Sequence, residues 1–142
     1  MTETPPAGNS EPDAPRGSLS LQTIAMPADT NPHGDIFGGW LMSQMDLAGG
    51  IAARTRTGGR IVTIAVDAMV FHKPVSVGDV VSVYAEEIRV GRTSVTFRLE
   101  AWVIWHDTMV RHKVTEARYT YVAVDENGRK RPIPAADDVL SA

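Results

Sequence analysis

The sequence contains no cysteine, and this absence excludes disulfide bonds, thiolate metal ligands and a cysteine nucleophile. It also lacks any apolar run near the roughly 20 residues that cross a bilayer. Its 14 basic residues are outnumbered by 17 acidic ones, so the formal net charge is -3. We therefore expect neither a membrane nor a nucleic-acid partner.

A recognisable targeting segment is absent as well. Residues 1–18 have no apolar stretch and a single basic residue, Arg16, a composition unlike that of a signal or transit peptide. We therefore expect a cytoplasmic protein. Rich in Pro, Glu, Ser and Gly, residues 1–18 cannot bury enough surface to order themselves. The sequence predicts a disordered tail over 1–18, one folded domain over 19–134 and a flexible tail over 135–142.

Several catalytic signatures are missing too. No serine stands in a Gly-x-Ser-x-Gly motif, so a serine hydrolase has no support. The histidines show neither metal-ligand spacing nor a carboxylate partner in sequence, and we expect them to be surface or packing residues. They are His33, His72, His106 and His112. The sequence predicts no metal site.

What the chain does contain is one helical pattern and several strand patterns. A short strand is expected over Leu21–Met26, followed by a turn-rich loop. From Trp40 to about Thr55, apolar residues recur at helical spacing. Four runs rich in Val, Ile, Thr and aromatics then predict strands. They cover residues 60–72, 79–90, 92–105 and 112–124.

The third run alternates regularly between apolar and polar residues, which is typical of a strand with one buried face. The apolar set is Val95, Phe97, Leu99, Ala101 and Val103. A single helix laid across one antiparallel sheet is an economical way to bury both apolar faces. The sequence therefore predicts an α+β fold.

Two features could carry chemistry. Gly38 and Gly39 directly precede the helix, where glycine lets a ligand approach and free N–H groups favour negative charge. A plain entry turn is the alternative for this pair. Asp46 lies inside the helix with no Lys or Arg at i±3 or i±4. Its carboxylate would either be partly removed from water, which suits acid–base work, or reach solvent on the outer face.

Other polar residues are weaker candidates. Asp35 stands in the loop before the glycines, where most aspartates form turns or caps. Lys73, Arg89 and Arg92 would ordinarily be solvated charges, although they could also hold phosphates.

The stretches 25–31, 34–40 and 42–46 closely resemble the bacterial hotdog acyl-CoA thioesterases, nearest to the broad-specificity group. The likeness continues through shorter matches and covers nearly everything from Thr23 to Pro134. These matches lie at 66–71, 73–74, 77–79, 90–92, 121–125 and 128–129. So many motifs in order over the whole domain make the resemblance specific.

The resemblance implies a hotdog fold, in which a five-stranded antiparallel sheet wraps a long central helix. It implies protomers paired edge to edge, with active sites at that interface, and further assembly as trimers of dimers. Asp46 would be general base or nucleophile, and the Gly39 N–H would polarise the thioester carbonyl. Asp35 matches a position that holds Asn or Asp in relatives and faces the partner's helical acid. The implied substrate- and CoA-binding residues are Asn31, Gly38, Lys73, Pro74, Val90, Gly91, Arg92 and Ser94.

The expected activity is hydrolysis of acyl-CoA to a free fatty acid and CoA, with no metal or organic cofactor beyond the CoA of the substrate. Attack by water activated at Asp46 and direct attack by Asp46 both remain open. The alternatives are a non-catalytic acyl-CoA sensor, a hotdog acyl-thioester hydratase or dehydratase, and a structural domain without a ligand. No histidine follows in the helix region, which argues against the hydratase, and the presence of Asp46 argues against the sensor.

Overall fold

The fold is known from a computed structural model, which describes residues 14–136. The two expected tails therefore lie largely outside the described residues. The helices and strands, in chain order, are β1 (Ser18–Ile24), η1 (Pro27–Asp29), α1 (Gly38–Thr57), β2 (Ile61–Phe71), β3 (Val80–Val90), β4 (Ser94–Ile104) and β5 (Arg111–Ala123).

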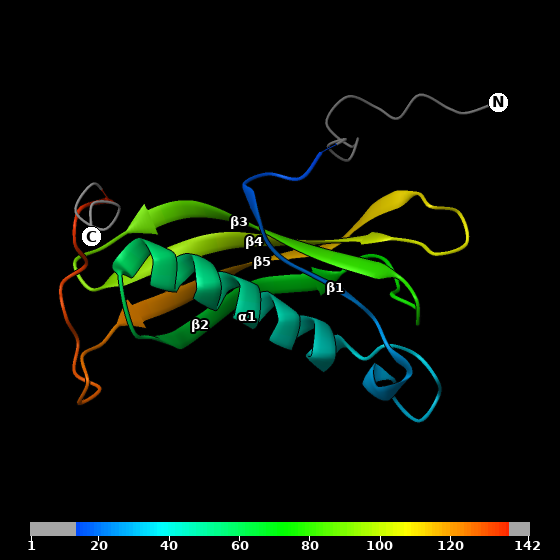
Figure 1. The fold of residues 1–142 in the computed structure, drawn as a ribbon, viewed down its shortest axis with the longest axis horizontal. Helices are drawn as coiled ribbons and strands as arrows, with labels where there is room; N and C mark the ends of the chain where they lie inside the picture. Colours follow the sequence, from blue (N-terminus) through cyan, green and yellow to red (C-terminus); the bar gives the residue numbers. More distant parts are fainter. Residues whose placement is uncertain (1–13, 137–142) are drawn as a thin grey trace.

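The strands form one antiparallel sheet in the order β1-β3-β4-β5-β2, and α1 lies across one face of it (Figure 1). β1 and β2 are the two edges, so each has one side of its backbone that pairs with no other strand among residues 14–136. The predicted arrangement of one helix across a five-stranded antiparallel sheet is confirmed. This topology places the helix start and the helix end over opposite ends of the sheet.

Helix α1 buries a stripe that includes Leu41, Met45 and Ala48 against the sheet. Burying a Leu or Met side chain contributes roughly 1.5–3 kcal/mol, so this stripe fixes the helix in place. The helix runs two residues beyond the predicted range at each end. It stops at Gly58, which takes the left-handed conformation (φ 76) and donates its N–H to the Arg54 carbonyl. Within residues 14–136, no helix combines the length and apolar character needed to span a membrane.

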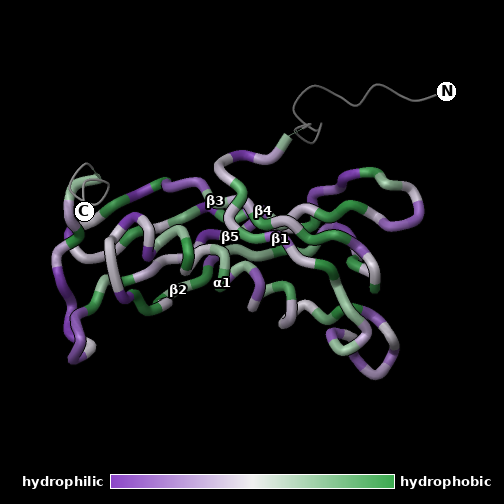
Figure 2. Tube along the Cα trace, in the orientation of Figure 1, coloured by the Kyte–Doolittle hydropathy of each residue, from purple (hydrophilic) through white to green (hydrophobic). Residues whose placement is uncertain are grey.

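The central strand β4 follows the predicted alternation. Its apolar set, Val95 to Val103, is buried beneath α1. Figure 2 shows that the most hydrophilic stretches lie in the connections at the two ends of the sheet. The core therefore lies between α1 and the middle of the sheet, and polar loops surround both ends of it.

The opposite face of the sheet holds a compact group of charges. Glu100 is fully buried there, and its carboxylate accepts the Trp102 indole N–H (2.9 Å) and contacts the Arg98 guanidinium (3.3 Å). Arg98 also pairs with Glu116 (2.6 Å), which Lys113 contacts from its other side. Burial alone raises the pKa of Glu116, but the hydrogen bonds and charges of Lys113 and Arg98 outweigh it and hold the pKa below its usual range.

The first strand starts earlier than predicted, at Ser18 instead of Leu21. Ser18 pairs with Ala85 of β3, and a bulge between Leu19 and Leu21 shifts the register. Ser20, at that bulge, donates its hydroxyl to the Ala48 carbonyl of α1 (2.6 Å). Pairing along β3 thus extends the strand beyond the short apolar run that sequence patterning detects.

Candidate active site

Asp46 lies in the middle of α1 and points to the side of the helix nearest β2 and β5. Its Oδ1 atom accepts the Thr63 hydroxyl of β2 (2.8 Å) and the Tyr121 hydroxyl of β5 (3.2 Å). Thr63 and Tyr121 are direct cross-strand neighbours, so both reach the same carboxylate oxygen. Within residues 14–136, the half-buried Asp46 has no ion-pair partner and Oδ2 accepts no hydrogen bond. One oxygen is held while the other is left for chemistry.

Tyr121 reaches the helix because residue 49 is glycine. A Cβ at Gly49 would lie 2.0 Å from the Tyr121 hydroxyl oxygen and 2.9 Å from Cδ1 of Leu99. The fully buried Tyr121 also donates toward the main-chain carbonyl of Asp46 (3.3 Å). Tyr119, two residues earlier on β5, donates to the Met42 carbonyl one helical turn away (3.1 Å).

The two tyrosines remain protonated hydrogen-bond donors. Burial, followed by the negative charge of Asp46, raises the pKa of Tyr119 to about 12. Burial is also the main cause that raises the pKa of Tyr121, followed by the charge of Asp46 and its hydrogen bond. Because Tyr121 ionises less readily than a free tyrosine, it can donate to Asp46 across the ordinary pH range.

The start of α1 offers backbone N–H groups. Phe37 is the N-cap, and its carbonyl accepts the Trp40 amide (3.1 Å). The amides of Gly38 and Gly39 find no backbone acceptor within the described residues. These amides and the positive end of the helix dipole can bind a developing oxyanion.

A cavity of about 230 Å³ opens beside this helix start. It brings together three of the predicted residues, Gly38, Lys73 and Pro74. The aromatic rings of Phe37 and Phe71 also line it, and the missing Cβ of Gly38 would lie 3.2 Å from the Phe71 ring. Glycine at position 38 therefore keeps the ring and the helix start in close contact.

The loop before the helix is held by Asn31. Its Oδ1 accepts the amides of His33 (2.9 Å) and Asp35 (3.1 Å), and its own amide donates to the Asp35 carbonyl (2.7 Å). The Asn31 side chain thus stabilises the turn before α1, and this role is independent of any contact with the substrate. Asp35 is exposed at this turn, and the described residues show no hydrogen bond between Asp35 and Asp46. We call Asn31, Asp35, Gly38, Gly39, Lys73 and Pro74 the helix-start group.

The remaining predicted residues, Val90, Gly91, Arg92 and Ser94, form the turn between β3 and β4. The Gly91 amide donates to the Ser94 carbonyl (2.7 Å), and the Ile133 amide donates to the Arg92 carbonyl (2.8 Å). The Arg92 side chain is exposed and forms no ion pair with a described acidic residue. We call these four residues the far-turn group.

The two groups lie at opposite ends of the sheet. Ser94 pairs with Val122, which pairs with Val62 near the start of β2, while Lys73 follows the other end of β2 at Phe71. Phe71 lies nine positions after Val62 along the strand, which corresponds to about 30 Å. Within one chain, the structure therefore does not bring the far-turn group to the helix-start group.

Asp46 and Gly39 are also apart. Seven residues of helix place them about 10 Å apart along the axis. Both lie on similar faces of α1, but the Gly39 amide points toward the helix start and away from Asp46. A carbonyl carbon cannot lie within reach of both groups of a single chain.

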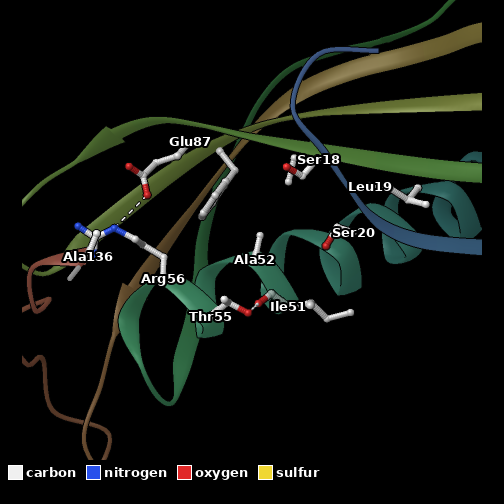
Figure 3. A pocket seen from close by; sticks show the side chains of 11 residues that line it. Ser18, Leu19, Ser20, Ile51, Ala52, Thr55, Arg56, Glu87 and Ala136 are labelled. Carbon is white, nitrogen blue, oxygen red and sulfur yellow. Dashed lines mark hydrogen bonds and ion pairs between the residues drawn. The ribbon is translucent and has the colours of Figure 1, made fainter. Parts of the chain in front are cut away.

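Two further features involve none of the predicted site residues. A cavity of about 470 Å³ lies between the second half of α1 and β1, on the side of the helix opposite β2 (Figure 3). The Arg56–Glu87 ion pair (3.0 Å) is at its rim, and no predicted site residue lines it. The buried Asp79 carboxylate pairs with the exposed His106 ring (2.8 Å) and accepts the Ser76 amide, so it fastens two loops together.

Sequence patterns missed three residues of the Asp46 environment: Thr63, Tyr121 and Gly49. Thr63 and Tyr121 are separated from Asp46 by 17 and 75 residues, so only strand register reveals them. Gly49 did carry a signal. A glycine inside a helix is about 1 kcal/mol less favourable than alanine, which indicates close approach by another group.

The fold and the helical carboxylate together define a hotdog domain with a candidate acid–base site. A family model described as the Thioesterase superfamily matches residues 33–104. The acyl-CoA thioester hydrolase YciA of Salmonella typhimurium is 51% identical over 125 residues, covering 86% of this chain and 94% of the relative. The chain therefore belongs to the thioesterase superfamily.

Solved structures agree with this assignment. A hexameric hotdog fold thioesterase of Campylobacter jejuni matches with a TM-score of 0.80 and 43% identity, over 88% of this chain and 95% of that one. A hexameric broad specificity acyl-coenzyme A thioesterase matches with a TM-score of 0.83 and 47% identity, over 91% and 93% of the two chains. The hotdog fold and the family resemblance predicted from the sequence are confirmed.

Proposed function

We propose that this chain hydrolyses acyl-CoA thioesters to a carboxylic acid and CoA, with Asp46 as the catalytic carboxylate. The observation that carries the proposal is the environment of Asp46, whose Oδ1 accepts the Thr63 and Tyr121 hydroxyls while Oδ2 accepts no hydrogen bond from residues 14–136. A general base needs such a free oxygen within reach of a water. The names of the relatives, an acyl-CoA thioester hydrolase and an acyl-coenzyme A thioesterase, support the substrate class.

In the proposed reaction, Oδ2 of Asp46 takes a proton from a water whose oxygen attacks the thioester carbonyl carbon. The carbonyl oxygen becomes an oxyanion, and the Gly39 amide stabilises it. Collapse of the tetrahedral intermediate breaks the C–S bond, and the CoA thiolate leaves and takes up the proton. CoA is part of substrate and product, and no other cofactor is needed.

Direct attack by Asp46 would instead give a mixed anhydride. Single-turnover hydrolysis in ¹⁸O-labelled water detects the anhydride route when water attacks the anhydride at its Asp46 carbonyl, whereas attack at its acyl carbonyl gives the same labelling as activated water. Activated water places the label in the acid product and leaves the protein unlabelled. Hydrolysis of an anhydride at its Asp46 carbonyl places the label on the Asp46 carboxylate.

The proposed site needs two chains. Gly39 and Asp46 are about 10 Å apart in one chain, so we assign the oxyanion donor to one protomer and the carboxylate to its partner. Edge strand β2 supports such a pairing because it exposes Ile64 (57%), Val66 (40%) and Val70 (58%) beside a backbone edge that pairs with no other described strand. Pairs of this kind would be the units of a trimer of dimers, as fits the hexameric relatives.

Antiparallel pairing of β2 with its copy would also unite the two groups of CoA-binding candidates. The Phe71 end of one strand would meet the Val62 end of the other. Lys73 of the helix-start group and Arg92 of the partner subunit would then approach one substrate, and both could bind its phosphates. Asp35 would face Asp46 of the partner subunit, as the resemblance implies.

The first experiment measures thiol release from an acyl-CoA panel, acetyl to palmitoyl. Asp46→Asn keeps the shape but cannot act as a base, so kcat/KM should fall by about 10²–10⁴. Asp107→Asn, in an exposed turn, is the matched control and should leave the rate unchanged. Full turnover in Asp46→Asn would overturn the catalytic assignment, and an inactive wild type that still binds CoA would indicate a sensor.

The oxyanion donor is tested at Gly39 by two substitutions. Gly39→Pro removes the N–H at a first-turn position where proline is tolerated, whereas Gly39→Ala keeps it. Losing one oxyanion donor costs about 10²–10³ in rate, so only the proline variant should lose activity to that extent. Equal losses in both variants would count against a role for the amide.

The two-chain site is tested by mixing Asp46→Asn with Gly39→Pro. A mixed dimer has one site with both groups intact, so a 1:1 mixture that exchanges subunits should recover about a quarter of wild-type activity. If both groups acted within one chain, every site would lack one group and activity would stay at the level of the separate variants.

A further inference from the structure

Tyr121 makes two hydrogen bonds to Asp46, the candidate base, although the proposed reaction gives Tyr121 no role. Its hydroxyl lies 3.2 Å from Oδ1 of Asp46 and 3.3 Å from the main-chain oxygen of the same residue. Thr63 donates to the same Oδ1, but it is exposed on edge strand β2, whereas Tyr121 is fully buried on β5. Of the two donors, Tyr121 is the one that the protein core fixes.

The position of the Tyr121 hydroxyl is set from three sides. Its oxygen occupies the space that a Cβ at Gly49 would take, at 2.0 Å. Its ring stacks beside Tyr119, with centroids 6.4 Å apart and an interplanar angle of 21°. Leu99 of β4 packs at the same point against α1. A phenol held in this way cannot follow the carboxylate if the carboxylate turns, so it fixes the rotamer of Asp46.

We propose that Tyr121 is a positioning residue for the reaction: its buried hydroxyl holds Oδ1 of Asp46, stabilises the ionised carboxylate and leaves Oδ2 for the water. This inference rests on the proposed function of Asp46. A hydrogen bond donated to a carboxylate favours its charged form. Because burial raises the pKa of Tyr121, the phenol keeps its proton throughout the range in which Asp46 would act as a base.

The test compares Tyr121→Phe with Tyr119→Phe. Both variants remove one phenol oxygen from the same face of β5, and both remove a hydrogen bond to a carbonyl of α1. Only Tyr121→Phe removes a donor from the Asp46 carboxylate. Tyr119→Phe is therefore the matched control for a purely structural role.

The readout is the acid limb of the pH profile of kcat/KM. Without its donor the carboxylate protonates more readily, so in Tyr121→Phe the midpoint of this limb should move up by roughly half to one pH unit. Tyr119→Phe should leave the midpoint unchanged. Equal shifts in both variants, or no shift in Tyr121→Phe, would overturn the proposal.

A second substitution at Tyr121 should move the midpoint of the acid limb in the opposite direction. Such a shift distinguishes a lost hydrogen bond from unfolding of the variant. Replacing Tyr121 by 3,5-difluorotyrosine keeps the shape and makes the phenol a stronger donor. The midpoint should then move to lower pH, a result that loss of packing cannot produce. A midpoint that stays unchanged or moves upward would count against Tyr121.

An NMR titration separates this inference from the proposed function. Aspartate labelled with ¹³C at the carboxyl carbon gives a signal for Asp46, assigned by its loss in Asp46→Asn. The titration midpoint of that signal should rise in Tyr121→Phe and not in Tyr119→Phe. This holds even if no acyl-CoA is hydrolysed, in which case the proposed function fails and the positioning role is still decided by the midpoint.

Discussion

Replacing Gly49 by alanine is the sharpest structural test of how the site is built. The new Cβ would lie 2.0 Å from the Tyr121 hydroxyl oxygen and 2.9 Å from Cδ1 of Leu99. Real carbon atoms do not approach so closely, so the tyrosine or the helix has to move. Gly50 is its natural control, since a Cβ there would meet only Cδ1 of Ile61 at an ordinary 3.9 Å.

The expected change in the free energy of unfolding is the sum of opposing effects. Alanine is favoured over glycine inside a helix by about 1 kcal/mol, and this gain applies at both positions. At Gly49, overpacking costs about 1–3 kcal/mol, and the weakened hydrogen bonds of Tyr121 cost about 1 kcal/mol more. We therefore expect Gly49→Ala to destabilise by about 1–3 kcal/mol and Gly50→Ala to stabilise by about 1 kcal/mol.

Denaturant unfolding at fixed protein concentration measures both changes, because oligomer stability depends on concentration. Thiol release on the same samples should show reduced activity in Gly49→Ala, whose Tyr121 is displaced, and normal activity in Gly50→Ala. If Gly49→Ala matched Gly50→Ala in stability and rate, the close approach of Tyr121 to the helix would not exist as described.

Other predictions concern the candidate base Asp46, the assembly of protomers and the charged residues on the face of the sheet opposite α1. Thr63→Val should lower kcat/KM by roughly tenfold or more because it removes a hydrogen bond to a charged group, whereas Thr63→Ser should retain most of the rate. Ile64→Lys places a charge on the exposed β2 edge and should lower the mass measured by light scattering together with the activity. Because the folded-state pKa of Glu116 lies below its usual value of 4.5, its stabilisation is present above about pH 4.5 and lost as the pH falls further. Acid unfolding should therefore be less steep in Glu116→Gln than in wild type.

The fold was within reach of sequence patterns because its signals are local. The alternation in β4 and the 3.6-residue spacing of Leu41, Met45 and Ala48 each require only neighbouring residues. Asp46 also emerged locally, as an aspartate inside a helix without a basic neighbour. Boundaries were less accurate, because the start of β1 at Ser18 depends on its partner Ala85.

The environment of Asp46 was beyond local patterns. Tyr121 reaches Asp46 only because β5 passes beneath the third turn of α1 in one particular register. The residues next to Asp46 in the sequence give no indication of that register. The resemblance implied active sites between protomers, with Asp35 facing the partner's helical acid, but it did not say which protomer contributes Lys73 and which contributes Arg92. Strand β2 runs about 30 Å from Val62, in register with the far-turn group, to Phe71, next to the helix-start group, so one chain cannot bring both groups to one substrate.

The choice of neighbours around Asp46 has a chemical reason. A lysine or arginine beside the carboxylate would also fix it, but a full positive charge favours the ionised form strongly and weakens the carboxylate as a base. Thr63 and Tyr121 donate neutral hydrogen bonds, which orient the carboxylate at a smaller cost in basicity. Both donate to Oδ1, so the oxygen that must take a proton is the one that is not stabilised directly. An aspartate held in this way can act as a base because its partners define where it points without neutralising its charge.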